Sequence, residues 1–445
     1  MALTGLDIYK QLPKKNCGEC GVPTCLAFAM ALAGGKASLD SCPYVSDAAR
    51  AMLESAAAPP IAKVIIGTGE AQYEMGDETE LYRHDKRFYH ETAIVFSVSD
   101  TLSEEEIKKR VEEINGLTFV RVGLTYKVQG VAVVNDSGEP GAFEKATRTV
   151  ADNTNLALVL VSESPQAIEK ALALVGDRRP LVYAANGQNY EKMAELAKSK
   201  SCPLAVRGDS LNEVAELVDK VVGLGHKDLV IDPGARQVAR AVADFTEIRR
   251  LSIKKRFRSV GYPIIAFTTE TDPMAEVMEA IPLVTKYASM VVMRTTDKGY
   301  ILPLLTWRQN LYTDPQTPIR VEEKLNEIGE VNENSPVYVT SNFSLTYYTV
   351  EGEVEGSRIP SYLISVDTNG LSVMTAYADG KFTAEKIAEV MKKLGVEEKV
   401  KHRTIVIPGT VAVLKGKLEE LSGWDVIVGP REASGIPAFA RARFA

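Results

Sequence analysis

Short apolar runs alternate with amphipathic stretches through the middle of the chain. The apolar runs predict strands at 93–98, 118–122, 156–161, 181–185, 203–206, 229–231, 264–267 and 290–293. Between most of these runs, apolar residues recur every three or four positions. This spacing predicts helices at 103–115, 165–175, 190–198, 211–222, 235–254 and 273–286. Nearly all-apolar strands that alternate with helices are typical of a parallel sheet buried on both faces.

The number and spacing of these strands favour a central TIM barrel, because eight strands with intervening helices make up that fold. An open doubly wound sheet remains the alternative. The connection between the second and third strands is longer than a simple repeat and has room for an extra strand at 129–134. A short strand pattern at 63–66 comes before the alternation, and the aromatic stretch at 82–90 fits no element.

A separate α/β pattern follows a break at 314–318. Its apolar runs predict strands at 337–340, 362–366, 371–375, 404–407 and 426–428, and its amphipathic stretches predict helices at 345–351, 383–394, 412–420 and 433–441. Small residues follow several strands, at 340–342, 368–370, 408–410 and 429–430. Ligands of open α/β sheets bind at the carboxyl ends of strands, where small residues let a large ligand contact backbone. We therefore expect a Rossmann-like α/β domain with a ligand site.

These patterns divide the chain into three domains, at 1–58, 59–315 and 319–445. The first domain contains most of the cysteines and ends in an Ala- and Pro-rich stretch at 56–60, which we interpret as a linker. The Pro-containing break at 314–318 is interpreted in the same way. Both linkers predict mobile domains.

Composition excludes several classes of function. Hydrophobic residues make up 45% of the chain and charged residues 25%, as in soluble globular proteins. The net charge of −7 provides no overall basic field for nucleic acid or an anionic membrane. No run of about 18 apolar residues could span a membrane, and the first residues lack the apolar core of a signal peptide. We therefore expect a cytoplasmic protein without a nucleic-acid or membrane partner.

Four of the five cysteines form a compact motif with the spacing C-x2-C-x4-C-x16-C: Cys17, Cys20, Cys25 and Cys42. A reducing compartment argues against disulfides, so the motif predicts a metal site. A zinc site is the alternative, but structural zinc sites with four cysteines usually show two closely spaced pairs, and this motif has one. The sequence therefore favours an iron–sulfur cluster, most simply a [4Fe–4S] centre.

The residues around the motif agree with a cluster. Gly18 and Gly21 flank the close pair and permit a sharp backbone. Cys25 opens a helix-like run, and an anionic cluster is stabilised at a helix N-terminus. Cys42 is followed by Pro43, as is the fourth cysteine of bacterial ferredoxins.

Other reactive side chains give weaker signals. Cys202 lies just before an apolar strand and is interpreted as a small buried hydrophobic residue. The four histidines form no metal-ligand pair at helical spacing, and no complete dinucleotide motif or P-loop is present. Asp232 follows the sixth predicted barrel strand, on the face where barrels place active sites. The Pro-Gly that follows it is more typical of a tight turn.

The cysteine segment 17–25, together with Cys42-Pro43, resembles the cluster domain of a known family. This is the family of large (gamma) subunits of the corrinoid iron–sulfur protein of the acetyl-CoA synthase/CO dehydrogenase (reductive acetyl-CoA) pathway. The resemblance covers the whole chain, in the order cluster domain, barrel, corrinoid-binding α/β domain. The segments 340–343 and 369–375 are similar to that family's corrinoid loops.

The resemblance implies a corrinoid methyl carrier. A separate methyltransferase would deliver a methyl group from methyltetrahydrofolate onto Co(I), and acetyl-CoA synthase would receive it, while the [4Fe–4S] cluster reductively reactivates Co(II). The implied partners are a smaller subunit in a heterodimer, the methyltransferase, acetyl-CoA synthase/CO dehydrogenase and a low-potential electron donor. The resemblance assigns no catalytic residue; it implies that the four cysteines hold the cluster and that the corrinoid contacts are Thr340, Gly370, Leu371, Ser372, Val373, Thr375 and Gly409.

Two other functions stay open from the residues alone. One is an iron–sulfur electron-transfer or TIM-barrel enzyme subunit without corrinoid, and the other is a scaffold stabilised by zinc. If a corrinoid is bound, no Asp-x-His-x-x-Gly loop exists to supply a cobalt ligand, and His402 is the only histidine of the C-terminal region. We therefore expect cobalt without a protein histidine and with the corrinoid's own base detached. Removing the axial nitrogen would make Co(I) accessible to a low-potential cluster.

Overall fold

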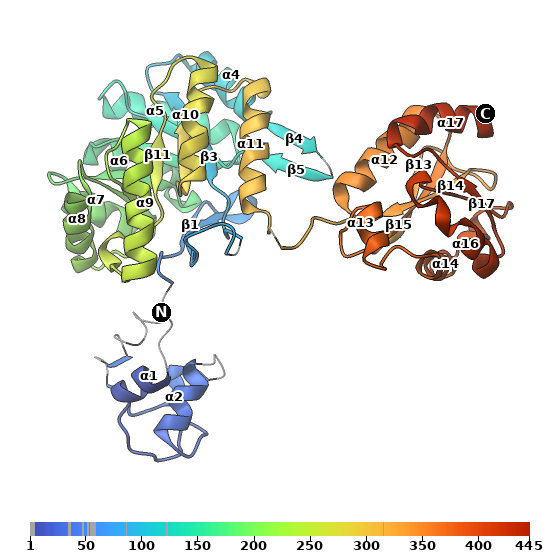
Figure 1. Cartoon of the computed structure of the whole chain (residues 1–445). Helices are drawn as coiled ribbons and strands as arrows, with labels where there is room; N and C mark the ends of the chain where they lie inside the picture. Colours follow the sequence, from blue (N-terminus) through green and yellow to red (C-terminus); the bar gives the residue numbers. More distant parts are fainter. Residues whose placement is uncertain are drawn as a thin grey trace. The chain divides into compact units, whose positions relative to one another are not determined.

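The computed structural model of the chain (Figure 1) describes residues 5–33, 37–46, 49–50, 53, 59–85, 87–121, 123–314 and 316–445. Positions 56–58 and 315, which belong to the two expected linkers, lie outside the described residues. The chain divides into two compact units: Met1–Leu117 with Lys127–Tyr312, and Thr118–Tyr126 with Thr313–Ala445. The three-domain boundaries stay a prediction.

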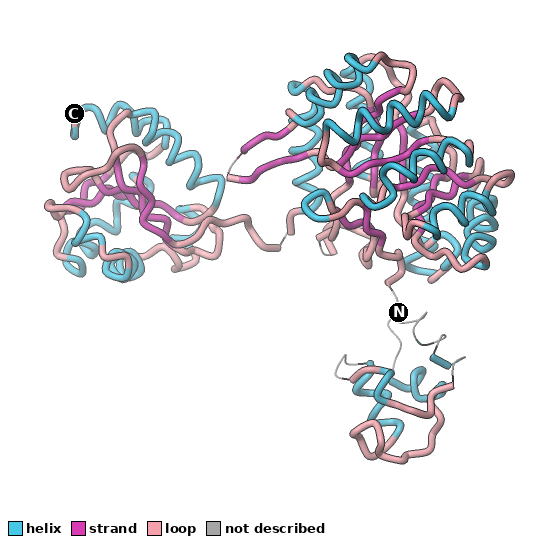
Figure 2. Tube along the Cα trace, turned by 180° about the vertical axis from the view of Figure 1, so that it is seen from behind, coloured by secondary structure: helices cyan, strands magenta, loops and turns pink. Residues whose placement is uncertain are grey.

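The first unit contains an eight-stranded parallel sheet in the order β10-β9-β8-β7-β6-β3-β12-β11. A parallel bridge between Ile231 and Ile264 joins the two end strands, so the barrel is nearly closed. Helices surround the strands in Figure 2. The strands are β3 (Ala93–Ser99), β6 (Gly130–Val134), β7 (Ala157–Val161), β8 (Leu181–Ala185), β9 (Leu204–Arg207), β10 (Leu229–Asp232), β11 (Ile265–Phe267) and β12 (Met290–Met293).

The surrounding helices begin at polar caps that the sequence supplies. Ser103 forms a capping box with Glu106, and Ser164, Ser210 and Asp272 each accept a backbone N–H in the first turn of the following helix. The helices are α4 (Glu104–Asn115), α5 (Pro140–Asn153), α6 (Pro165–Val175), α7 (Tyr190–Ser199), α8 (Leu211–Gly223), α9 (Val238–Lys255), α10 (Pro273–Thr285) and α11 (Lys298–Tyr312). The expected TIM-barrel class is therefore confirmed as an α/β barrel.

One predicted barrel strand is wrong. The segment expected at 118–122 forms β4 (Thr118–Arg121), which pairs with β5 (Leu124–Lys127) in a separate two-stranded sheet. The barrel strand at this point is β6, in the segment predicted as an extra strand. The physical reason is burial, because β4 leaves most of its side chains exposed, whereas the Gly-Val-Ala-Val-Val run of β6 is almost wholly buried.

The amino-terminal side of the barrel interior is covered by a hairpin. β1 (Val64–Ile66) pairs antiparallel with β2 (Tyr73–Met75), and its apolar side chains join the core formed by the strand interiors. The following segment, which the sequence left unassigned, is fixed by a buried ion pair of 2.9 Å between Glu78 and Arg249.

The N-terminal region contains α1 (Gly5–Gln11) and α2 (Cys25–Ala33). Within the described ranges, no helix is long and apolar enough to cross a membrane.

The second unit is built on a five-stranded sheet in the order β13-β15-β14-β16-β17. Four strands are parallel and β13 is antiparallel at the edge. The strands are β13 (Lys324–Ile328), β14 (Val337–Ser341), β15 (Ser361–Val366), β16 (Thr404–Ile407) and β17 (Asp425–Val428). The helices are α12 (Ser344–Ser357), α13 (Val373–Ala378), α14 (Ala384–Lys393), α15 (Val396–Lys399), α16 (Lys415–Ser422) and α17 (Ile436–Phe444).

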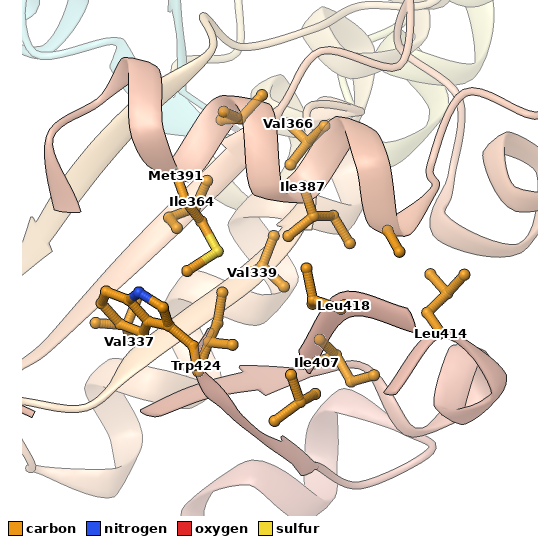
Figure 3. Close-up of a cluster of buried hydrophobic side chains, with 14 of the residues drawn as sticks. Val337, Val339, Ile364, Val366, Ile387, Met391, Ile407, Leu414, Leu418 and Trp424 are labelled. Atoms are coloured by element: carbon orange, nitrogen blue, oxygen red, sulfur yellow. The ribbon is translucent and has the colours of Figure 1, made fainter. Parts of the chain in front are cut away.

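Apolar cores cover both faces of this sheet. On one face, Val339 and Ile364 pack against Ile387 and Met391 of α14 and Leu418 of α16 (Figure 3). On the other face, side chains of β14, β15 and β16 form a second cluster with α12 and α17. This two-sided burial explains why the parallel strands are continuous apolar runs.

Two predictions for this unit are wrong. The strand expected at 371–375 is a turn followed by α13, because Asn369 and Gly370 adopt positive φ angles of 57° and 74° and Ser372 takes the N-cap position of the helix. The edge strand β13 was missed, because its sequence Lys-Leu-Asn-Glu-Ile lacks the continuous apolar run of a central strand.

Candidate cofactor sites

The four N-terminal cysteines lie in and around one small apolar core. Cys25, the first residue of α2, and Cys42 are buried, Cys20 is half-buried beside them, and Cys17 is exposed. All four are free of disulfides. Among the residues that the structure describes, no three Cys, His, Asp or Glu side chains are placed so that they could hold a metal ion. The structure thus gathers the cysteines in one region without bringing them to ligand spacing.

The loop that carries the first two cysteines is folded against the start of α2. Gly18 and Gly21 have positive φ angles of 77° and 82°, as the sequence predicts for a sharp turn. The side-chain carbonyl of Asn16 accepts the backbone N–H of Cys25 at 2.8 Å, and the backbone N–H of Asn16 donates to the Cys25 Sγ at 3.4 Å. The Lys15 Nζ lies 3.7 Å from the centre of the Tyr44 ring.

These residues are chemically suited to an iron–sulfur cluster. Thiolates are the soft ligands that such clusters require. The buried side of the loop is apolar, and a helix N-terminus and a nearby lysine favour the negative charge of a thiolate-bound cluster. The fifth cysteine, Cys202, is fully buried, and burial raises the pKa of its thiol to about 11. It therefore behaves as the apolar residue that its sequence context predicts.

A cavity opens at the carboxyl edge of the second unit's sheet. In the sheet, β14 lies between β15 and β16. The chain therefore continues from β14 to β15 on one side, and later adds β16 on the other side of β14. Ligands of α/β sheets bind at such a reversal of strand order. The cavity has a volume of about 260 Å³. Its lining comes from the ends of β14 and β16, from α12 and α13, and from the loops 408–410 and 429–433: Tyr338, Val339, Thr340, Thr346, Val350, Ser372, Val373, Met374, Val406, Ile407, Pro408, Thr410, Gly429, Pro430, Arg431, Ala433 and Ile436.

Three of the seven predicted corrinoid contacts line this cavity: Thr340, Ser372 and Val373. The other four lie beside it. The backbone N–H of Gly370 donates to the Asn342 side chain at 3.0 Å, Leu371 packs on the core, and the Thr375 hydroxyl lies 3.0 Å from that of Ser372.

Gly409 lies where two loops that line the cavity approach each other. A Cβ atom at this position would lie 2.4 Å from the carbonyl oxygen of Gly429, so only glycine allows this approach. The backbone N–H of Gly409 donates to the carbonyl of Pro430 at 2.9 Å. Gly409 is thus positioned to shape the cavity.

Two hydroxyls on the cavity lining lack partners. Tyr338 and Thr340 are almost completely buried, and neither the Tyr338 OH nor the Thr340 Oγ1 has a hydrogen-bond partner among the described residues. Burying a hydroxyl without a partner costs about 1–3 kcal/mol. Burial raises the pKa of Tyr338 to about 12, so this hydroxyl keeps its proton and can donate. Both hydroxyls therefore belong to residues that line the cavity, and among the described residues neither has a partner.

Sequence reasoning missed part of this site. Arg431 is the one cation on the described lining of the cavity, and Ala433 and Ile436 close one side. The only signal was the small-residue loop at 429–430 after β17, which indicated a ligand edge without identifying the side chains that follow it. The unpartnered hydroxyls depend on three-dimensional burial and left no signal in the sequence.

Family models match both parts of the chain. The model described as "CO dehydrogenase/acetyl-CoA synthase delta subunit" matches residues 63–440, and the one described as "Putative Fe-S cluster" matches residues 12–44. The second range includes all four clustered cysteines. The strand-end cavity and the barrel both lie within the first.

The chain also has full-length relatives. It is 70% identical to the corrinoid/iron–sulfur protein large subunit of Moorella thermoacetica, over 100% of both chains. It is 37% identical to the acetyl-CoA decarbonylase/synthase complex subunit gamma of Methanothermobacter thermautotrophicus, over 99% of this chain and 98% of the relative. A dihydropteroate synthase from Thermus thermophilus aligns in structure with a TM-score of 0.38 and 14% identity, covering 50% of this chain and 94% of that one.

The CO dehydrogenase/acetyl-CoA synthase subunit model thus covers the parallel barrel and most of the α/β sheet unit of this chain, and the iron–sulfur model covers its cysteine motif. The chain belongs to that family, and within it to the corrinoid/iron–sulfur protein large subunits. The resemblance drawn from the cysteine spacing and the two loop segments is confirmed.

Proposed function

We propose that this chain is a corrinoid methyl carrier that works with a CO dehydrogenase/acetyl-CoA synthase system. The observation that carries the proposal is its 70% identity, over full length, to a protein named as a corrinoid/iron–sulfur protein large subunit. The cavity at the strand-order reversal, with its two unpartnered hydroxyls, supports it independently. The methyl group would come from methyltetrahydrofolate through a methyltransferase and pass to acetyl-CoA synthase.

Two cofactors have separate roles in this proposal. Cys17, Cys20, Cys25 and Cys42 would hold a [4Fe–4S] cluster, and a Rossmann-like domain at 319–445 would hold a corrinoid. When bound, the corrinoid supplies the cobalt that carries the methyl group, and the cluster supplies the electron that restores Co(I) after oxidation. The cysteine domain would occupy 1–58 and the barrel domain 59–315.

The chain's own residues would bind and orient the corrinoid. Tyr338 and Thr340 would donate hydrogen bonds from the cavity wall, and Arg431 would offer a positive charge to an anionic substituent. Gly409 would keep the cavity floor open by allowing two loops to approach. The cavity of about 260 Å³ admits a substituent rather than a whole macrocycle, so the ring itself would lie across the strand ends.

A carrier of this kind needs several partners. A smaller subunit would complete a heterodimer, since the full-length relative is named a large subunit. A methyltransferase, acetyl-CoA synthase/CO dehydrogenase and a low-potential electron donor would meet the carrier at different stages. This division of labour agrees with a chain that carries the methyl group while other proteins catalyse its transfer.

We expect bound cobalt to have no histidine ligand from this chain. The Nε2 of His402 lies 2.9 Å from the carbonyl of Ser335, and its Nδ1 accepts the backbone N–H of Thr404 at 3.2 Å, so both ring nitrogens are occupied. His402 comes before β16, at the opposite end of that strand from the cavity. With the corrinoid's own base also detached, as the sequence leads us to expect, the Co(II) state should show no nitrogen superhyperfine splitting in electron paramagnetic resonance. His402→Ala should leave that spectrum unchanged. Splitting from a coordinated nitrogen would refute this expectation.

A visible spectrum of the anaerobically purified protein, with its small subunit, tests the proposed function against its alternatives. The methyl carrier should show corrinoid bands above broad iron–sulfur absorption. An electron-transfer or barrel enzyme subunit would show only the broad absorption, and a zinc scaffold would be colourless. Either of the last two results, obtained after reconstitution with cobalamin, would contradict the proposal.

A further inference from the structure

A second cavity lies at the carboxyl mouth of the barrel, in the first unit. Its volume is about 680 Å³, and its lining comes from the ends of β3, β6, β7, β8, β11 and β12 together with α4 and the loop after β10. Barrel proteins place their ligand sites on this face. None of the cysteines and none of the proposed corrinoid contacts belongs to the described lining of this cavity.

Three arginines reach the cavity: Arg110, Arg236 and Arg294. The Arg110 Nη1 donates to the Thr296 hydroxyl at 2.9 Å, and its Nη2 donates to the backbone carbonyl of Arg294, so these two arginines share one side of the mouth. The carboxylate of Glu113 lies 3.7 Å from the Arg110 guanidinium. Burial lowers the pKa of Arg110 from its usual value, and the nearby carboxylates of Glu113 and Glu276 offset part of this effect.

The carboxylates behind the cavity wall are already occupied. Both oxygens of Glu276 accept short hydrogen bonds, from the Thr268 hydroxyl at 2.6 Å and from the backbone N–H groups of residues 294 and 295 at 2.7 Å each. The Arg294 guanidinium lies 3.6 Å from this carboxylate and is 46% exposed. Glu276 therefore fixes the backbone at the end of β12 and only partly neutralises the Arg294 side chain.

Asp232, the candidate from the sequence, has a structural role on the other side. Its carboxylate accepts the Tyr183 hydroxyl at 2.6 Å and the Arg236 guanidinium at 2.7 Å, and it also accepts the backbone N–H of Gly234 at 2.8 Å. It is 1% exposed. With every oxygen engaged, Asp232 orients Arg236 and Tyr183 and has no free position for a ligand.

The rest of the wall is apolar and aromatic. The rings of Tyr183 and Phe267 lie 4.8 Å apart between centroids, and the guanidinium carbon of Arg236 lies 5.1 Å from the centre of the Phe267 ring. Val161 and Val292 continue this surface. The one carboxylate on the described lining, Asp136, is exposed, where water screens its charge. The cavity therefore combines an apolar surface with cations on its rim.

We infer that the barrel mouth binds a small organic anion, a carboxylate or a phosphate ester with an apolar or aromatic body. The anionic group would lie between Arg110 and Arg294, and the body would pack against Phe267 and Val292. Arginine pairs bind carboxylate and phosphate oxygens through charge-assisted hydrogen bonds, and a partly dehydrated site strengthens them. The chain would then have a small-molecule site in addition to its two proposed cofactor sites.

Calorimetric titration of the full-length protein with two anionic probes, phenyl phosphate and benzoate, tests this inference. At least one should bind saturably, and the stronger of the two identifies the anionic group. Phenol and benzyl alcohol, which lack the charge, should bind more weakly. Arg294→Gln and Arg110→Gln should each weaken binding of the anion by about tenfold or more, because each variant removes a charge-assisted hydrogen bond to it.

Arg148→Gln is the matched control, since Arg148 lies on α5 outside the cavity and pairs with Glu144 at 3.6 Å. It should leave the anion affinity unchanged. Leu102→Trp provides a second test by narrowing the mouth, which keeps the inference testable if an arginine variant folds poorly. No saturable binding of either anion, equal binding of the uncharged probes, or binding that persists in the arginine and Leu102 variants would overturn the inference. Iron and corrinoid contents should stay the same in all variants, which separates this site from the proposed cofactor sites.

Discussion

Replacing Cys20 by alanine is expected to remove the [4Fe–4S] cluster or convert it to a smaller one. Cys20 belongs to the close pair and lies half-buried beside Cys25 and Cys42, so no other described thiol can take its place. Iron and acid-labile sulfide should fall from about four of each per chain, the content of one such cluster. Corrinoid binding should remain, because the corrinoid is assigned to a separate unit.

Cys202→Ala is the matched control for this variant. It removes one thiol from the chain, but the thiol is fully buried in the barrel and its pKa is raised to about 11, so it is not a cluster ligand. Iron and sulfide should keep their original values in this control. Full iron content in Cys20→Ala, or stoichiometric zinc with little iron in the parent protein, would contradict the assignment of the four cysteines.

Filling the strand-end cavity is expected to abolish stoichiometric corrinoid binding. Thr410→Trp places an indole on the lining of a cavity of about 260 Å³, where it would occupy the space needed by the ligand. A steric clash of this kind costs about 1–3 kcal/mol, which corresponds to a loss of affinity of about five- to 150-fold. Cobalt analysis and the corrinoid absorption bands of the purified protein measure the loss, and the iron content should not change.

Val413→Trp is the control for the filled cavity. Val413 lies in the same short helical segment, Gly409–Leu414, but is 71% exposed and does not line the cavity. A tryptophan there should leave corrinoid binding intact. Equal corrinoid content in both variants would show that the corrinoid binds to another part of the chain.

The barrel was predictable because burial on both faces leaves a strong pattern in the sequence. Seven of the eight predicted strands, the exception being 118–122, are barrel strands in the structure. The wrong strand was predicted because two candidate strand segments, 118–122 and 130–134, lie close together in the sequence. The barrel strand is the one of the two that is wholly apolar. The run at 130–134 satisfies this condition, whereas β4 has Thr118 and Arg121 exposed.

The cofactor sites were predictable only in part. Cysteine spacing is a local property, so the candidate ligands could be named from the sequence, and the structure gathers them without bringing the described ones to ligand spacing. The conformation of the proposed corrinoid loops depends on turns as well as on apolar runs. The positive φ angles of Asn369 and Gly370 change the segment that follows from a strand to a helix. The unpartnered hydroxyl of Thr340 follows from tertiary packing, which no local pattern encodes.

The most direct test of the central claim is methyl transfer to the protein itself. The reduced protein, assembled with its small subunit and corrinoid, is mixed anaerobically with methyltetrahydrofolate and the methyltransferase, and the visible spectrum is followed. Co(I) absorption should disappear as methyl-cobalt absorption forms in an amount equal to the bound corrinoid, and acetyl-CoA synthase should then remove the methyl group. Bound corrinoid that is reduced to Co(I) but accepts no methyl group from an active methyltransferase would contradict the proposed role as a methyl carrier.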